Sequence, residues 1–228
     1  GFQARESQLA MAQLIQKSIA ERNCDVIEAS TGIGKSFAYL VPAFLSNSKI
    51  LISTGTKNLQ DQLFKKDIPL INKTIVSGKQ LALLKGRSNY CCPYHLNKSR
   101  QQPDFQTRQY APIFDALKSW SESSVIGDIS EFTNLPERDP LWQKVTSTQN
   151  NCLSNECPDY EICFVIKARR KAQKADVIVI NHHLFFSDQA IKDEGFGELL
   201  PEVDVLIFDE AHQLPDIAGH FFGRSLTM

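Results

Sequence analysis

The fold is decided by the stretch Asp25-Val-Ile-Glu-Ala-Ser-Thr-Gly-Ile-Gly-Lys-Ser36. Its first five residues are typical of a short strand, and apolar residues then recur at helical spacing from residue 34 to residue 45. Two glycines lie between, and they let the backbone turn tightly and direct N–H groups toward an anion. The following helix adds the positive end of its dipole. The pattern predicts a strand over 25–29, a phosphate-binding loop and a helix over 34–45.

The loop and the first helical residues supply the candidate phosphate ligands. Lys35 carries the charge that reaches the β- and γ-phosphates of a nucleotide, and the hydroxyl of Ser36 is a ligand for Mg²⁺. Ala29 stands where the usual pattern of such a loop has its first glycine. The residues that we expect to bind nucleotide here are Ser30, Thr31, Gly32, Ile33, Gly34, Lys35 and Ser36.

A second apolar run ends in acidic residues, in the segment Val205-Leu-Ile-Phe-Asp-Glu-Ala-His212. Asp209 at the strand end is suited to hold Mg²⁺, and Glu210 is suited to polarise a water molecule that attacks the γ-phosphate. Taken alone, an Asp-Glu pair after a strand is often only a solvated strand end. Together with the loop it predicts ATP hydrolysis, with Lys35, Asp209 and Glu210 as catalytic residues.

Strands and helices alternate along most of the chain, because continuous apolar runs alternate with apolar residues at helical spacing. The expected strands are 25–29, 49–53, 80–84, 177–180 and 205–208, and the expected helices are 6–22, 34–45, 58–66 and 164–174. This order predicts an α/β fold with a parallel sheet covered on both faces. Pro42 is expected to kink or cut its helix, since an interior proline costs about 3 kcal/mol.

The alternation stops over residues 86–170, where polar residues and most of the cysteines gather. A crossover between strands needs only about a dozen residues, so this stretch is an inserted subdomain. We expect it to be too poor in apolar residues to fold on a core of its own. One helix is indicated within it, by an apolar stripe made of Tyr110, Ile113, Phe114, Leu117 and Trp120.

Five of the six cysteines lie in this insert. Cys152, Cys157 and Cys163 are separated by four and five residues, and the adjacent pair Cys91 and Cys92 precedes them. Without a secretory signal, clustered cysteines are more often metal ligands than disulfides. Four thiolates with no convincing histidine partner fit an iron–sulfur cluster and a zinc site equally well, and chance thiols are the third alternative.

Several segments resemble superfamily-two helicases. Asp209-Glu-Ala-His212 is similar to their signature box, Arg5-Glu-Ser-Gln8 to their adenine-reading segment, and residues 52–63 to the segment that holds a single-strand backbone. Lys85-Gly-Arg-Ser-Asn-Tyr-Cys-Cys92, followed by the three later cysteines, resembles the iron–sulfur helicases of the XPD/DinG family. Asn181-His-His-Leu-Phe185 is similar to the bacterial YoaA-like branch of that family.

The resemblance implies a RecA-like P-loop NTPase domain that binds ATP and Mg²⁺ and unwinds DNA with 5′→3′ polarity. It adds Arg5, Gln8 and His212 to the nucleotide-binding residues and makes Ser36 and Asp209 the ligands of Mg²⁺. The implied partners are single-stranded or forked DNA and a replication or repair protein, in the cytoplasm and nucleoid of a bacterium. The implied domains are motor residues 1–85 and 171–228 and the cluster insert 86–170.

It also implies one [4Fe-4S] cluster, bound by Cys92, Cys152, Cys157 and Cys163. The usual bacterial spacing selects Cys92 as the first ligand, whereas a shorter eukaryotic-like spacing selects Cys91. Such a cluster would stabilise the polar insert rather than carry out redox chemistry. Because helicases of this type use a second motor domain that supplies an arginine finger, we expect this chain to be an N-terminal portion with little activity alone.

Composition limits where DNA could bind. The net charge is −1, and 22% charged and 42% hydrophobic residues fit a folded protein without a global basic excess. No apolar run approaches the ~18 residues of a membrane span. DNA contacts would therefore be local, through the basic run 167–174, Lys85 and Arg87, with Tyr90 or Trp120 stacking on a base. A solvated helix face is the alternative for the basic run.

Two other functions fit the same residues. One is a non-catalytic module that binds nucleotide or DNA or docks a partner, and the other is a redox sensor that uses the cluster as a switch. DNA-stimulated ATP turnover separates the enzyme from the first of these. His182 and His183 are not expected to bind a metal, because adjacent side chains at a strand end point apart.

Overall fold

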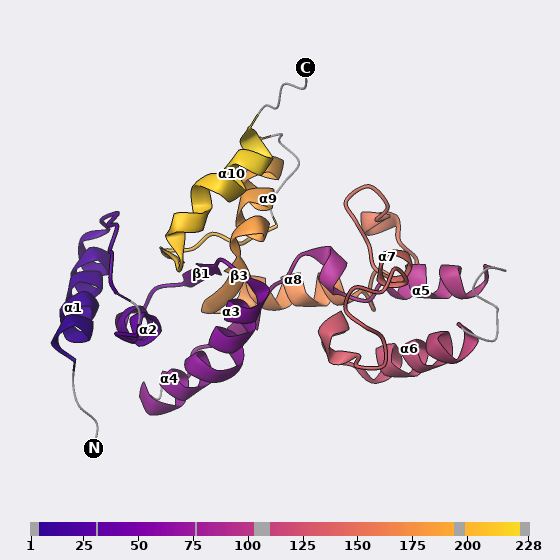
Figure 1. The fold of residues 1–228 in the computed structure, drawn as a ribbon, viewed down its shortest axis with the longest axis horizontal. Helices are drawn as coiled ribbons and strands as arrows, with labels where there is room; N and C mark the ends of the chain where they lie inside the picture. Colours follow the sequence, from indigo (N-terminus) through magenta and orange to yellow (C-terminus); the bar gives the residue numbers. More distant parts are fainter. Residues whose placement is uncertain (1–4, 31, 76, 103–109, 194–198, 224–228) are drawn as a thin grey trace. The chain divides into compact units, whose positions relative to one another are not determined.

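The computed structural model describes residues 5–30, 32–75, 77–102, 110–193 and 199–223. The backbone divides into two compact units, Gly1–Leu83 with Ala172–Met228, and Leu84–Lys171. Each unit has its own hydrophobic core. Figure 1 shows the helices and strands of the chain, coloured by position in the sequence. Among the described residues, no helix combines the length and the hydropathy needed to cross a membrane.

Within its described residues, the first unit is built on a four-stranded parallel sheet in the order β2-β3-β1-β4. The central strand β1 is wholly buried, and its register sets Ser53 beside Ile180 of β3 and Phe208 of β4. The predicted α/β fold with a parallel sheet is confirmed, as are four of the expected strands. The strands are β1 (Ile50–Thr54), β2 (Leu81–Leu83), β3 (Val177–Asn181) and β4 (Val205–Phe208).

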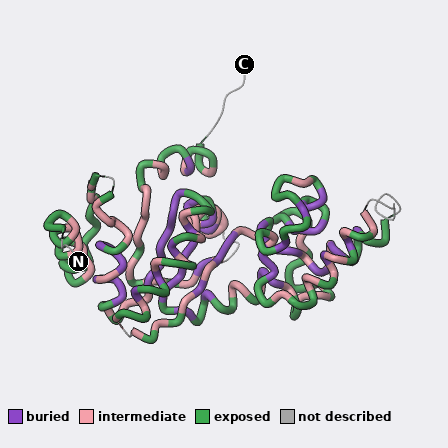
Figure 2. Tube along the Cα trace, turned by 60° about the horizontal axis from the view of Figure 1, so that its bottom comes forward, coloured by how far each residue is buried: buried purple, intermediate pink, exposed green. Residues whose placement is uncertain are grey.

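The helices of the first unit pack apolar side chains against these strands. Leu40, Phe44 and Ile68 join β1 and β3 in one buried cluster. Figure 2 colours buried residues purple along the chain. The helices are α1 (Glu6–Glu21), α2 (Lys35–Leu45), α3 (Lys57–Gln62), α4 (Ile68–Ile75), α9 (His182–Asp193) and α10 (Leu214–Phe222), with a π-helical turn η1 (Leu63–Asp67) and a 3₁₀ turn η6 (Ala211–Gln213). Sequence periodicity alone did not indicate α4, α9 and α10.

One expectation for this unit is wrong, and a second is wrong in part. Residues 25–29 do not form a strand, and the side chain of Val26 is 96% exposed. A short apolar run gains little from an extended conformation unless a neighbouring strand pairs with it. Of the two outcomes expected for Pro42, a kinked or a cut helix, the cut does not occur, because α2 continues to Leu45. The proline removes only the one N–H that would donate to the carbonyl of Ala38, and the helix ends three residues later.

The second unit has short helices joined by long irregular segments. The helix expected around the apolar stripe is present as α6, and the one expected over 164–174 as α8, which runs on into the first unit. The elements are α5 (Pro93–Arg100), α6 (Ala111–Ser123), α7 (Trp142–Val145) and α8 (Phe164–Lys174), with 3₁₀ turns η2 (Arg87–Asn89), η4 (Ile129–Glu131) and η5 (Ser154–Glu156).

This unit does have a core of its own, contrary to expectation. The rings of Trp120, Phe132 and Trp142 stack edge to face or tilted, with centroids 5.5 and 6.0 Å apart. Trp120 belongs to the predicted stripe of α6, whereas Phe132 and Trp142 come from short segments without a regular spacing, so periodicity did not reveal them. The buried cluster comprises Tyr90, Cys91, Leu96, Phe114, Leu117, Phe132, Leu135, Leu141, Trp142, Val145, Phe164 and Val165.

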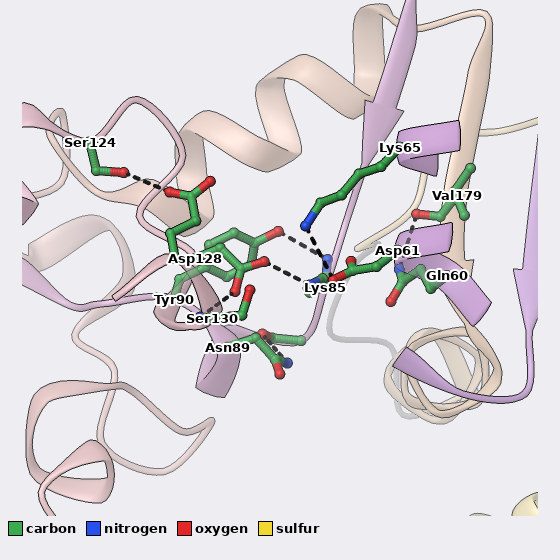
Figure 3. A network of polar contacts seen from close by, with 12 residues as sticks. Gln60, Asp61, Lys65, Lys85, Asn89, Tyr90, Ser124, Asp128, Ser130 and Val179 are labelled. Atoms are coloured by element: carbon green, nitrogen blue, oxygen red, sulfur yellow. Dashed lines mark hydrogen bonds and ion pairs between the residues drawn. The ribbon is translucent and has the colours of Figure 1, made fainter. Parts of the chain in front are cut away.

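A buried ion pair lies where the chain enters the second unit. Lys85 Nζ is 2.7 Å from Asp128 Oδ2, and the two side chains are only 4% and 9% exposed (Figure 3). The backbone N–H of Lys85 donates to the hydroxyl of Tyr90 at 3.0 Å, and that of Ser130 donates to Asp128 at 3.0 Å. Burial raises the pKa of Asp128, but the hydrogen bonds that the carboxylate accepts from Lys85 and Ser130, and the charge of Lys85, outweigh burial and hold that pKa below its usual value.

Candidate active site and cysteine pocket

The phosphate loop has the backbone that its glycines permit. Gly32 and Gly34 have φ angles of 80° and 86°, in the left-handed region that side-chain-bearing residues rarely adopt. Gly34 is the N-cap of α2, so Lys35 and Ser36 occupy the first helical positions, at the positive end of the helix dipole. Thr31, one of the expected ligands, lies outside the described residues.

The start of α1 lies against this loop. The guanidinium of Arg5 donates to the carbonyl of Gly32, and the amide of Gln8 donates to the carbonyl of Gly34 at 3.0 Å. A Cβ atom at Gly34 would collide with the Gln8 amide, which would then have to move away from the loop. The structure thus brings two residues of the N-terminal segment onto the loop that follows them by more than 20 positions.

The acidic strand end meets α2. Asp209 follows β4 directly, and its backbone N–H donates to the carbonyl of Ser53 in β1 at 2.8 Å. Its Oδ2 accepts a hydrogen bond from the hydroxyl of Tyr39 at 3.0 Å. Burial raises the pKa of Asp209, whereas the bond from Tyr39 and the charge of Lys35 act in the opposite direction. The predicted residues Lys35 and Asp209 therefore lie near enough for their charges to interact.

Glu210 has an unusual backbone. Its φ of 61° is left-handed, a conformation that costs a non-glycine residue about 1 kcal/mol or more and that is common at functional sites. Its carboxylate lies 3.4 Å from Nδ1 of His212, and both side chains are partly or largely exposed. The turn keeps Glu210 accessible to water beside the half-buried Asp209.

Tyr39 is a site residue that the sequence did not suggest. It is 3% exposed and occupies an apolar position of α2, one turn after Ser36, so the sequence pattern indicated a core residue. Burial raises the pKa of its phenol, and the charge of Asp209 raises it further, so the hydroxyl remains a donor. The one indication in the sequence was that this position in the apolar face of the helix holds a tyrosine, whose hydroxyl needs a hydrogen-bond partner when it is buried.

His182 is a second such residue. It begins α9 rather than ending a strand, is fully buried, and lies 2.7 Å from the hydroxyl of Ser53 through Nδ1. Burial lowers its pKa, which keeps the imidazole neutral. Its ring packs on that of Phe208 with centroids 5.8 Å apart, whereas the adjacent His183 is exposed. Ser53 thereby connects the buried imidazole to the backbone of Asp209.

The segment expected to contact a DNA single strand, residues 52–63, uses several of its polar groups in hydrogen bonds within the protein. Thr56 caps α3 by accepting from the N–H of Leu59 at 3.2 Å, and Gln60 donates to the carbonyl of Val179 at 3.3 Å (Figure 3). Both Gln60 and Ser53 are buried. Of the predicted segment 52–63, residues 56–58 and Gln62 are exposed.

Four cysteines line one pocket in the second unit, a cavity of about 150 Å³. They are the four that the sequence analysis selects, Cys92, Cys152, Cys157 and Cys163. Burial raises the pKa of Cys92 to about 11, although its backbone hydrogen bond lowers it, and the three other thiols add to the rise. Among the described residues, no group of three or more histidine, cysteine or acidic side chains is arranged to hold a single metal ion.

Cys91 and Cys24 lie elsewhere. Cys91 is 1% exposed within the apolar core of the second unit, and its backbone pairs with Gly127 and Thr146. Cys24 is exposed in the first unit. The doubled cysteine is therefore divided between two environments, because adjacent extended residues project to opposite sides.

Two arginines share the pocket with the thiols. Arg87 and Arg169 both line the cavity, together with the aromatic side chains of Tyr94 and Tyr160. Burial lowers the pKa of Arg169 and the charge of Arg87 lowers it further, while the thiols of the pocket act in the opposite direction. The neighbouring Arg170 points elsewhere and forms two hydrogen bonds with Glu161, at 2.9 and 3.2 Å.

The parallel sheet, the glycine loop at a helix start and the acidic end of β4 define a RecA-like domain of the P-loop class. Residues 77–228 match the DEAD_2 family, and because that match covers more than half of the sequence, the chain belongs to this family.

Known relatives agree with this assignment. Over 227 residues, the chain is 49% identical to the ATP-dependent DNA helicase YoaA of Escherichia coli (strain K12) and 48% identical to that of Haemophilus influenzae. Both matches cover all of this chain and 36% of the relative. It is 35% identical over 218 residues to the ATP-dependent DNA helicase DinG of Photobacterium profundum, covering 88% of this chain and 31% of that protein. The chain thus spans about a third of the length of these relatives.

Proposed function

We propose that this chain contains the ATP-hydrolysing site of an iron–sulfur DNA helicase with 5′→3′ polarity. The names of its relatives support helicase activity. The observation that carries the hydrolytic part is the bond from Tyr39 in α2 to Asp209 after β4, because it joins the phosphate loop and the acidic strand end in one site. A cytoplasmic role in DNA repair, with a replication or repair protein as partner, would follow from such an activity.

The residues of this site divide the chemistry among them. Backbone N–H groups of the loop and the Lys35 ammonium would bind the β- and γ-phosphates. Ser36 and Asp209 would hold Mg²⁺, which neutralises charge on the phosphate oxygens when it is bound. Glu210 orients a water molecule and accepts its proton as the water oxygen attacks the γ-phosphorus. The bond from that phosphorus to the bridging oxygen breaks, which yields ADP and phosphate.

The adenine base would lie against the first turn of α1. Gln8 uses an amide hydrogen on the carbonyl of Gly34, so its Oε1 stays available to accept from the exocyclic amine of adenine. Arg5 fixes the loop by its bond to Gly32, and His212 lies beside Glu210. Ser30, Thr31 and Ile33 complete the proposed nucleotide contacts, through the loop backbone.

The cysteine pocket would hold one [4Fe-4S] cluster through Cys92, Cys152, Cys157 and Cys163. A cubane separates its four thiolate ligands more widely than a single ion does, so this assignment requires no single-ion geometry. The guanidiniums of Arg87 and Arg169 offset the negative charge of thiolates and cluster. Since the unit has an apolar core besides, the cluster fastens the irregular segment around Cys152–Cys163 to α5 rather than supplying all of the stability.

DNA would be held by exposed groups of each unit. Residues 56–58 offer a hydroxyl, an ammonium and an amide at the end of β1. Of the basic run, Lys171 is exposed, Lys167 lies over the ring of Phe164, and Arg170 is paired with Glu161. Replacing Lys167 and Lys171 with alanine should therefore reduce the salt dependence of single-strand binding, by about 0.7 in slope for each phosphate that the protein no longer neutralises.

The decisive experiment measures unwinding and single-strand binding by the full-length protein. Lys35→Ala should abolish ATP hydrolysis and unwinding while single-strand binding persists, because the loop lysine serves the phosphates alone. Lys73→Ala, a lysine in α4, is the matched control and should retain both activities. Unwinding by Lys35→Ala would refute the proposal, as would wild-type protein that binds nucleotide and DNA without turnover. Iron and acid-labile sulfide in anaerobically purified protein test the cluster, and zinc without sulfide would refute it.

A further inference from the structure

The side chain of Tyr39 is almost completely buried, yet its hydroxyl points at a charged group rather than into the apolar core. The side chain is 3% exposed and belongs to the buried cluster around β1 and β3. A buried hydroxyl without a partner costs about 1–3 kcal/mol, so the direction in which it points is strongly determined. It points at the carboxylate of Asp209, with 3.0 Å between the two oxygens.

The phenol belongs to the same helix face as the other proposed Mg²⁺ ligand. Ser36 lies three residues before Tyr39 in α2, and residues at this spacing share one helix face. Tyr39 therefore links the part of α2 that carries Ser36 to the carboxylate of Asp209, which lies 170 residues after Tyr39 in sequence.

The direction of this bond suits a carboxylate that binds a cation through oxygen. A phenol has a single proton, and here it goes to Oδ2 of Asp209, so the phenol does not occupy Oδ1. The carboxylate is thus turned by a hydrogen bond from a side chain that is not itself proposed to touch nucleotide or metal.

We propose that Tyr39 is a positioning residue for the metal site, holding Asp209 in the orientation that binds Mg²⁺ together with Ser36 and nucleotide. This inference rests on the proposed function, because it assumes that these two residues hold Mg²⁺. Hydrogen-bond partners of metal ligands fix the orientation of those ligands, and their loss commonly weakens metal affinity by about 10–100-fold. Phenylalanine fills the same space without the hydroxyl, so Tyr39→Phe isolates this role from packing.

The experiment measures how Mg²⁺ supports binding of a fluorescent ADP analogue to the full-length protein. Tyr39→Phe should raise the Mg²⁺ concentration for half-maximal binding by about tenfold, the lower end of the range for lost partners of metal ligands. Binding without Mg²⁺ and the midpoint of thermal unfolding should change little. Tyr90→Phe is the matched control, because it removes an equally buried phenol of the second unit that accepts from the backbone of Lys85. Its Mg²⁺ dependence should equal that of the wild type.

A double-mutant cycle keeps the test valid if Tyr39→Phe also lowers stability. In an Asp209→Asn background the effect of Tyr39→Phe on Mg²⁺ dependence should largely disappear, because the phenol acts through that carboxylate. An unchanged Mg²⁺ dependence in Tyr39→Phe, or an equal effect in both backgrounds, would overturn the inference. Wild-type protein whose nucleotide binding ignores Mg²⁺ would instead refute the proposed function, and this inference with it.

Discussion

The two units of the molecule place their functional side chains by different means. In the first unit, regular elements do so, since Lys35 and Ser36 begin α2 and Asp209 follows β4. In the second unit, the pocket cysteines lie in or beside irregular segments, and a buried ion pair and scattered aromatic residues hold the fold. Substitutions at the site of the first unit should therefore lower ATP hydrolysis and leave stability nearly unchanged. Substitutions of these residues in the second unit should lower its stability and leave nucleotide chemistry unchanged.

The largest expected effect is on the chemistry of the first unit. Glu210→Gln in the full-length protein should lower ATP hydrolysis by about 10²–10⁴-fold, since a general base contributes a factor of this size. The side chain is partly exposed at a turn, so the free energy of unfolding should stay within about 0.5 kcal/mol of the wild type. Phosphate release and thermal unfolding measure the two quantities, and a large loss of stability would contradict the comparison.

The second unit should respond in the opposite way to Asp128→Asn. This change leaves the ammonium of Lys85 buried beside a neutral amide, which costs about 3–5 kcal/mol. Both tryptophans of the chain lie in this unit, so denaturant unfolding followed by tryptophan fluorescence reports on it specifically. Glu161→Gln breaks the exposed pair with Arg170 and should cost at most about 1 kcal/mol, which makes it the matched control. If the two substitutions lowered the free energy of unfolding equally, the buried pair would contribute no more to stability than the exposed pair does.

The adjacent cysteines should separate metal binding from core packing. Cys92→Ser should remove iron and visible absorption while tryptophan-monitored unfolding still shows a cooperative core. Cys91→Ser should keep the iron but destabilise the unit by about 1–3 kcal/mol, since it puts a hydroxyl into an apolar core. Iron content and unfolding curves of both variants decide the matter. The reverse pattern would make Cys91 the first ligand.

The smallest effect concerns pH and the buried imidazole of His182. Its folded pKa lies below the usual value, so the unfolded chain takes up a proton first as pH falls below about 6.5. This proton uptake lowers stability by at most about 1.4 kcal/mol for each pH unit. Asp209, whose pKa is raised, acts in the opposite direction at lower pH. His182→Asn should flatten the fall in thermal midpoint between about pH 7 and 5.5, whereas exposed His183→Asn should not.

Sequence reasoning succeeded where local pattern and position coincide. The glycine loop, α2, β4 and the residues after it follow from spacing alone, because the carboxyl end of a buried strand and the start of a helix are fixed by the chain around them. It failed where a contact joins distant segments. The bond between Tyr39 and Asp209 spans 170 residues, and the core of the second unit gathers aromatic residues from irregular segments.

The same limit explains the missing strand and the divided cysteine pair. Val26 and Ile27 have strand propensity, but propensity alone cannot supply the neighbour with which a strand pairs. The spacing of the cysteines was compatible with either Cys91 or Cys92 facing the pocket. Which of the two side chains faces the pocket depends on the pairing of Cys91 with Thr146, a contact between residues more than 50 positions apart.

The partly exposed strand β4 has a consequence for how the chain behaves in solution. Among the described residues, β4 pairs with β1 alone, and Leu206 on it is 40% exposed. An open strand edge is a template on which a further strand can add, from another molecule or from the same one. At high concentration the chain should therefore self-associate through this edge. Pairing of residues 25–29 with β4 would cover this edge and prevent such aggregation. Because the phosphate loop follows residues 25–29 directly, the same pairing would also fix the position of that loop.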